Sequence, residues 1–125
     1  MIDSGEFSER LRQALTQRAV PHFQEAVDYA RANGLQADLQ FNQAPPALQL
    51  TLVRPSDGAA CSYRIAADSG AVLHEKTYGA EVQRLQASLD SVNQTLVETE
   101  LAAFFIKAAA LPLDYVAQRH QPGFF

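Results

Sequence analysis

The sequence is poor in the residues that most often form cross-links or carry chemistry. Its 125 residues include one cysteine, Cys61, three histidines and no tryptophan. A single cysteine excludes an internal disulfide, which is typical of proteins from reducing compartments. The first residues also lack the basic and apolar segments of a secretory signal. We therefore expect a cytoplasmic location.

An excess of basic charge and long apolar runs are missing as well. Ten Lys and Arg residues against fourteen Asp and Glu give a formal net charge of −4, and the basic residues are scattered. Binding to a phosphate backbone relies on clustered basic residues. The most apolar stretch, 101–111, contains Lys107 and would rise only about 16 Å as a helix, roughly half of a bilayer core. Nucleic acids and membranes are therefore not expected partners.

The common motifs of metal, phosphate and acyl-transfer chemistry are absent too. His22, His74 and His120 fall in separate expected elements, and no pair of histidines or cysteines has metal-ligand spacing. Neither a glycine-rich phosphate loop nor a serine nucleophile elbow occurs. We expect no metal and no cofactor, and the sequence favours a non-enzymatic function over an enzymatic one. If the chain is an enzyme, the candidate groups are those of Cys61, His74 and Tyr78.

Residues 3–33 have the pattern of an amphipathic helix. Asp3 can cap its start, and Gly34 can end it in a left-handed conformation. Pro21 interrupts the pattern, because proline lacks a backbone donor and clashes with the preceding turn. We expect one kinked helix or two abutting helices. Its apolar stripe, with spacings of three and four, comprises Phe7, Leu11, Ala14, Leu15, Phe23, Ala26, Val27 and Ala30.

Residues 35–78 alternate between apolar and polar side chains, as strands with one buried face do. Proline, glycine and aspartate clusters separate the alternating runs and predict turns. In the last run, Val72 and Leu73 compete for the inward face. Cys61 is in phase with the inward-facing residues of its run, so we expect a buried thiol that packs as a small hydrophobe. The four expected strands are 35–42, 48–53, 61–66 and 72–78.

Residues 80–111 have helical spacing. Val82, Leu85, Leu89 and Val92 recur in steps of three and four, which is typical of a narrow coiled-coil seam. Thr95 and Glu98 have the spacing of a capping box, so 80–111 is expected to be one helix or two. From 96 to 111 nearly every helical face is apolar, which indicates a helix in the core. Residues 112–125 are expected to form a short turn and a tail.

Strands that are polar on one face need helices on the other face only. We therefore predict a single α+β domain over 1–125. It is a two-layer sandwich in which the N-terminal and C-terminal helices cover one face of a four-stranded antiparallel meander. The expected core comprises Leu35, Leu39, Phe41, Leu48, Leu50, Leu52, Tyr63, Ile65, Leu101, Phe104, Phe105 and Ala108.

The function favoured by this composition is a non-catalytic protein-interaction module of the adaptor, chaperone-like or regulatory kind. The helical half has more apolar side chains than one face of a short sheet can cover, and closed two-fold pairing is the commonest way to bury such a surplus. We expect a homodimer, or else binding to another protein. The seam and the tail can instead pack within their own domain. The candidate contact residues are Val82, Leu85, Leu89, Val92, Phe124 and Phe125.

Two other functions stay open. A domain that binds or senses a small molecule would need an apolar pocket between the sheet and the helices. The residues expected to line it are Phe41, Tyr63, Phe104 and Phe105. A small enzyme is the third reading, and it requires the candidate catalytic groups to meet in one cleft.

Overall fold

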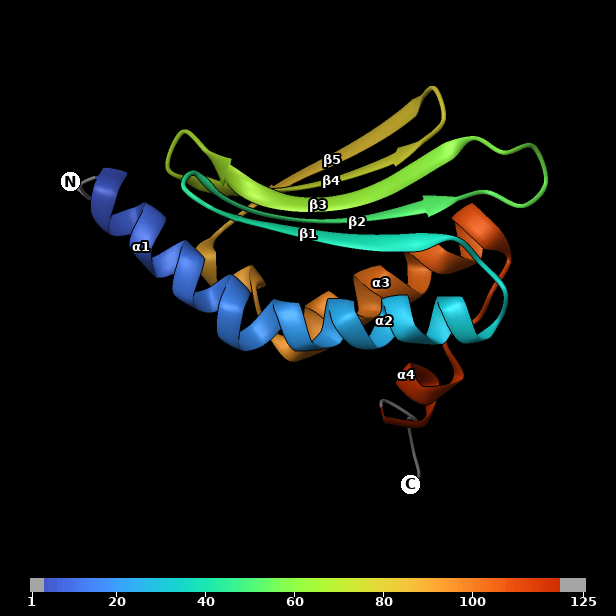
Figure 1. Ribbon diagram of the computed structural model, residues 1–125. Coiled ribbons are helices and arrows are strands. Elements are labelled where there is room, and N and C mark those ends of the chain that lie inside the picture. The colour runs from blue at the N-terminus through green and yellow to red at the C-terminus, as the bar shows by residue number, and fades with distance from the viewer. Residues whose placement is uncertain (1–3, 120–125) are drawn as a thin grey trace.

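The computed structural model describes residues 4–119. Along the chain, N-terminal helices come first, a five-stranded antiparallel sheet follows, and C-terminal helices come last. The helices lie together on one face of the sheet (Figure 1). This is the two-layer α+β arrangement that the sequence predicts, with one strand more than expected. The predicted cap Asp3, His120 and the Phe124–Phe125 tail lie outside the described residues.

The N-terminal helical segment is continuous across Pro21. It consists of α1 (Ser4–Ala14), a π-helical turn η1 (Leu15–Ala19) and α2 (Val20–Ala32). Pro21 cannot donate a backbone hydrogen bond, and a wider turn just before it lets the helix continue. After α2, Gly34 adopts a φ of 83°, and the N–H of Leu35 donates to the Ala30 carbonyl at 3.0 Å, which closes the helix as expected. Every member of the predicted apolar stripe is buried.

Four strands follow in the predicted order. They are β1 (Ala37–Gln43), β2 (Pro46–Val53), β3 (Ala60–Asp68) and β4 (Ala71–Tyr78), each antiparallel to the next. The register places Leu50 opposite both Leu39 and Tyr63, so their side chains share the face that the helices cover. On β4, Val72 is fully buried whereas Leu73 is half-buried. Val72 is therefore the residue that faces the helices.

The segment 81–87 is a fifth strand and not the start of a helix. β5 (Glu81–Ala87) pairs with β4 after a two-residue turn in which Gly79 has a φ of 64°. Val82 and Leu85 are three residues apart, so on a strand they point to opposite faces and form no seam. The expectation of a helix from residue 80 is therefore wrong. Every β5 side chain is at least partly exposed. With no buried face, β5 has no period-two pattern to mark it.

The C-terminal helices begin later than the sequence suggests. A short 3₁₀ turn, η2 (Leu89–Ser91), precedes α3 (Gln94–Ala109), and α4 (Asp114–Arg119) ends the described chain. The Asn93 side chain caps α3 by accepting a hydrogen bond from the N–H of Leu96 at 2.8 Å. Thr95 is therefore not the cap, and Glu98 does not complete a capping box with it. Within residues 4–119, no helix is long and apolar enough to cross a bilayer.

An aromatic cluster holds the two layers together. The Tyr63 ring lies 5.1 Å from Phe23 and 6.4 Å from Phe104, measured between centroids, and Phe104 lies 5.6 Å from Tyr78. The predicted residues Leu35, Leu39 and Phe41 are only partly buried and pack at the border of the core, beside the edge strand β1. The other predicted core residues are confirmed: Leu48, Leu50, Leu52, Tyr63, Ile65, Leu101, Phe104, Phe105 and Ala108.

Candidate functional site

The inward face of β4 is unusually polar for a face that meets the core. His74, Lys76 and Tyr78 alternate with outward residues and therefore point to the same side as Val72. His74 is 2% exposed. A buried imidazole is costly unless both ring nitrogens have partners. The surroundings of His74 supply them.

Both ring nitrogens of His74 are hydrogen-bonded. The Tyr63 hydroxyl lies 2.8 Å from Nδ1, and the Ser91 hydroxyl lies 2.8 Å from Nε2. A neutral imidazole has one donor and one acceptor, so Tyr63 and Ser91 take opposite roles. Either Tyr63 donates to Nδ1 and Nε2–H donates to Ser91, or the chain of hydrogen bonds runs the other way. The network joins β3, β4 and η2.

Burial sets the protonation of this network. It lowers the pKa of His74 below its usual value; the Glu100 carboxylate opposes this effect and the Lys76 ammonium adds to it. Burial also raises the pKa of Tyr63 well above its usual value, with a further contribution from Glu100. The pKa of Tyr78 rises to about 12, again chiefly through burial. At neutral pH all three groups are therefore uncharged.

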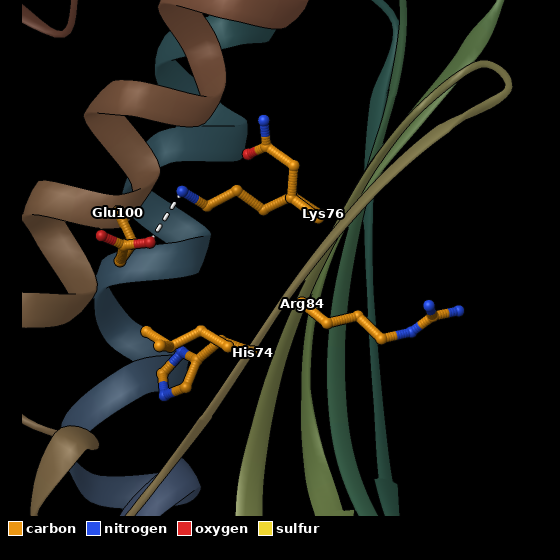
Figure 2. A pocket seen from close by; sticks show the side chains of 6 residues that line it. His74, Lys76, Arg84 and Glu100 are labelled. Atoms are coloured by element: carbon orange, nitrogen blue, oxygen red, sulfur yellow. Dashed lines mark ion pairs between the residues drawn. The ribbon is translucent and has the colours of Figure 1, made fainter.

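A small pocket lies beside this network, between β4, β5 and α3. Lys76 Nζ is 2.7 Å from Glu100 Oε1, and both side chains are largely buried. Figure 2 shows Lys76 and His74 pointing from the sheet toward α3, and Arg84 pointing away on the other side. The cavity measures about 150 Å³. Its lining residues are His74, Lys76, Gln83, Arg84, Leu85 and Glu100.

The geometry gives this site little catalytic capacity. Ser91, His74 and Tyr63 resemble a nucleophile, a base and an orienting group. However, the N–H of Ser91 donates to the Ser88 carbonyl at 3.0 Å, and the N–H of Val92 donates to the Leu89 carbonyl at 3.1 Å. Neither amide is available to stabilise an oxyanion, which is usually the largest catalytic contribution in such sites. What the network does provide is a hydrogen-bond partner for each ring nitrogen of a buried histidine.

The three candidate catalytic groups named from the sequence do not all come together. Cys61 is fully buried and lies directly opposite Tyr78 in the β3–β4 register. His74 is four residues from Tyr78 along the same strand, which is about 13 Å at the rise of a strand. The Cys61 thiol instead approaches the Ala59 carbonyl at 4.0 Å. The thiol, the imidazole and the Tyr78 phenol therefore form no common cleft.

The expected pocket of aromatic side chains is filled. Tyr63, Phe104 and Phe105 are fully buried and pack against one another, with 5.7 Å between the ring centroids of Phe104 and Phe105. Phe41 lies partly buried at the edge of the same core. The cavity beside β5 is smaller than the roughly 300–1,000 Å³ of typical ligand sites. The four aromatic side chains therefore fill the space between the sheet and the helices and line no pocket there.

The structure divides the predicted contact residues into two groups. Val82 and Leu85 on β5 are 42% and 48% exposed and are, with Ile106 on α3, the large hydrophobic side chains exposed among the described residues. Val92 is fully buried, and Leu89 packs against the core. Of the four predicted contact residues that the structure describes, Val82 and Leu85 are thus the two available to a partner. Phe124 and Phe125 lie outside the described part of the chain.

A second polar cluster lies where α2 and α3 meet. The Nδ1 atom of His22 is 3.4 Å from Oε2 of Glu98, and Gln94 Nε2 is 3.5 Å from the other Glu98 oxygen. Possible metal-ligand atoms of His22, Glu25 and Glu98 all lie within 4.8 Å of one another. Glu98 is 1% exposed, whereas His22 and Glu25 are partly exposed. This is the set of described residues that could hold a metal ion.

The sequence does contain a signal for this cluster. Glu98 shares a helical face with Leu101, Phe105 and Ala108, which are all buried. A carboxylate at a core position is rare unless it is paired or binds a metal. Lys76, Ser91 and Glu100 are harder to find, because their roles depend on which elements become neighbours.

No family model, curated protein or solved structure matches the chain.

Proposed function

We propose that this chain is a non-catalytic protein-interaction module, of the adaptor, chaperone-like or regulatory kind, and that it works as a homodimer joined along β5. The observation that supports the proposal is the exposure of β5 on both faces. Val82 lies on the open face of the sheet and Leu85 on the face beside α3. An edge strand with exposed apolar side chains is a template for pairing with another chain.

The backbone of β5 is arranged for such pairing. Gly79 and Ala80 form a two-residue turn, so Tyr78 and Glu81 are a hydrogen-bonded pair, and hydrogen-bonded pairs then alternate along the hairpin. Three β5 residues belong to the non-hydrogen-bonded pairs, and their N–H and C=O groups point away from β4: Val82, Arg84 and Gln86. These groups are the ones that a further strand would use.

The other edge of the sheet is partly occupied by its own chain. On β1, the carbonyl of Ala37 accepts a hydrogen bond from Arg31 Nε at 2.9 Å, and the Asp38 carboxylate is 3.1 Å from Arg31 Nη2. The long Arg31 side chain therefore lies along this edge and obstructs a new strand. β5 is the better docking edge for this reason.

A second copy of the chain is a suitable occupant of the β5 edge. The strand has one acidic and one basic residue, Glu81 and Arg84, so two copies carry no net charge against each other. A two-fold axis at Arg84 would place two guanidinium groups opposite each other, which is unfavourable. An axis at Leu85 instead pairs Leu85 with its own equivalent and Arg84 with Gln86. We propose the register centred on Leu85, because it buries the apolar side chain and separates the charges.

Multi-angle light scattering on matched variants tests the proposal. The wild type is expected to be a dimer at high micromolar concentration and Leu85→Asp a folded monomer, since the new carboxylate would lie beside its equivalent. Ile106→Asp is the control, because Ile106 is 57% exposed but lies on α3. It should stay dimeric. A monomeric wild type would overturn the proposal, as would a dimer that survives Leu85→Asp but not Ile106→Asp.

A further inference from the structure

We propose that His22, Glu25 and Glu98 form a zinc-binding site that joins α2 to α3. This inference does not rest on the proposed function, because the site is away from β5. Glu98 and Glu100 are two residues apart on α3 and therefore point to different sides of the helix. Glu100 pairs with Lys76 on the sheet, whereas Glu98 approaches His22 on α2.

The burial of Glu98 is the first argument. Its side chain is 1% exposed and lies on the face of α3 that otherwise carries core residues. Removing a carboxylate from water is unfavourable, and the usual compensations are an ion pair, hydrogen bonds or a metal ion. Its contacts include the His22 imidazole at 3.4 Å and the Gln94 amide at 3.5 Å. A divalent cation would balance its charge at the same place.

The geometry of the ligands is the second argument. His22 and Glu25 are three residues apart on α2 and so share one face of the helix, opposite Glu98 on α3. Metal sites between packed helices are built in this way, with a histidine and a carboxylate at a spacing of three on one helix and a carboxylate on its neighbour. The three ligand atoms lie within 4.8 Å of one another. Around a zinc ion they would be about 3.4 Å apart, so modest side-chain movement closes the site.

The chemistry of the ligands selects the metal. One imidazole nitrogen and two carboxylate oxygens suit Zn²⁺, which accepts both at about 2.0–2.2 Å and readily takes a water as the fourth ligand. His22 and Glu25 are partly exposed, which provides a route for the ion and room for that water. A bound zinc ion would tie the N-terminal helical segment to the C-terminal one.

Calorimetric titration of the untagged, chelator-treated full chain with zinc chloride tests this site. We expect one zinc ion per chain. Glu98→Gln and His22→Gln should each weaken zinc binding at least about tenfold. Loss of a group that only orients a metal ligand already costs about that much, so loss of a ligand should cost at least the same. Glu100→Gln is the matched control on the same helix and should bind zinc like the wild type. Absence of binding to the wild type would overturn the proposal, as would equal binding by Glu98→Gln and the wild type.

Thermal unfolding separates loss of the site from loss of the fold. Glu98→Gln removes the charge while keeping the side-chain shape, and the unfolding temperature of each metal-free protein is the reference for its zinc-induced shift. Zinc should raise the unfolding temperature of the wild type and of Glu100→Gln, because it binds the folded state, but not that of Glu98→Gln. A zinc-induced rise of the same size in Glu98→Gln would contradict the assignment.

Discussion

β3 and β5 are the two neighbours of β4, yet they have opposite environments. His74 lies opposite Ile65 on β3 and opposite Leu85 on β5. Ile65 is fully buried, whereas Leu85 is almost half exposed. Both strands pair with β4 in the same antiparallel way, yet the side chains of β3 lie in the core and those of β5 do not. Besides its backbone pairing with β4, β5 is held by ion pairs of Glu81 with Lys107 and of Arg84 with Glu75. The apolar side chains Val82 and Leu85 stay exposed.

The polar groups of β4 lie at the border between these two environments. Toward β3 the inner layer is aromatic and dry, with Tyr63 packed against Phe23 and Phe104. Toward β5 it becomes the Lys76–Glu100 ion pair and a small cavity. The hydrogen bonds of His74 therefore link a core residue, Tyr63, to a partly exposed residue, Ser91.

The largest expected difference is between Ile65→Ala and Leu85→Ala, two truncations on either side of His74. Ile65→Ala should lower the free energy of unfolding by about 2–5 kcal/mol, because it leaves a cavity in a packed core. Leu85→Ala should change it by less than about 0.5 kcal/mol when measured in protein dilute enough to be monomeric. Urea unfolding measures both. Losses of similar size would show that the helices cover β5 after all.

The buried hydrogen bond between Tyr63 and His74 should have an intermediate effect. Tyr63→Phe keeps the ring in the aromatic cluster but removes the partner of His74 Nδ1, and a buried polar atom without a partner costs about 1–3 kcal/mol. Ser91→Ala should cost less, since Ser91 is partly exposed and water can replace its hydroxyl. Chemical denaturation of the two variants checks this order. The reverse order would contradict the assignment of Tyr63 to the buried side of His74 and of Ser91 to its partly exposed side.

The smallest expected effect is a pH dependence that comes from His74. Its pKa lies below the ordinary value of 6.5 because burial disfavours the charged imidazole. Below pH 6.5 the unfolded chain therefore binds more protons than the folded one, so stability falls as the pH decreases toward the lowered pKa and is fully present above 6.5. Comparing unfolding of the wild type and His74→Gln between pH 7.5 and 5 measures this contribution. A smaller loss in the wild type than in His74→Gln would contradict it.

The part of the fold that one covered face determines was predictable from the sequence. Alternation marked β1, β2 and β3 because their inward side chains are buried or pack against the core, whereas the polar inward face of β4 left its orientation ambiguous. Gly34 marked the end of the first helical segment through its left-handed conformation. β5 was mistaken for a helix because neither of its faces is buried. Val82, Leu85, Leu89 and Val92 have the three- and four-residue spacing of a helix. In the structure Val82 and Leu85 lie on a strand, Leu89 lies in a 3₁₀ turn and Val92 is buried in the core.

The candidate sites were less predictable, because they depend on contacts between distant parts of the chain. His74 could be placed on a strand, but its partner Ser91 belongs to a turn that the sequence assigned to a helix. Glu98 was read as part of a helix cap, whereas Asn93 caps α3 and Glu98 meets His22 from α2. The spacing of histidines along the chain does not indicate the carboxylates that the fold brings beside His22.

Disulfide trapping of Leu85→Cys is the most direct test of the claim that β5 pairs with a second copy. In the register centred on Leu85, the two equivalent residues form a non-hydrogen-bonded pair with about 4.5 Å between Cα atoms, which a disulfide can bridge. The buried Cys61 should not compete. Under mild oxidation Leu85→Cys should yield a covalent dimer on a non-reducing gel, whereas Gln83→Cys, on the same face but opposite Ala87 of the other copy, should stay monomeric. Equal trapping of both variants, or no trapping of Leu85→Cys, would contradict the account.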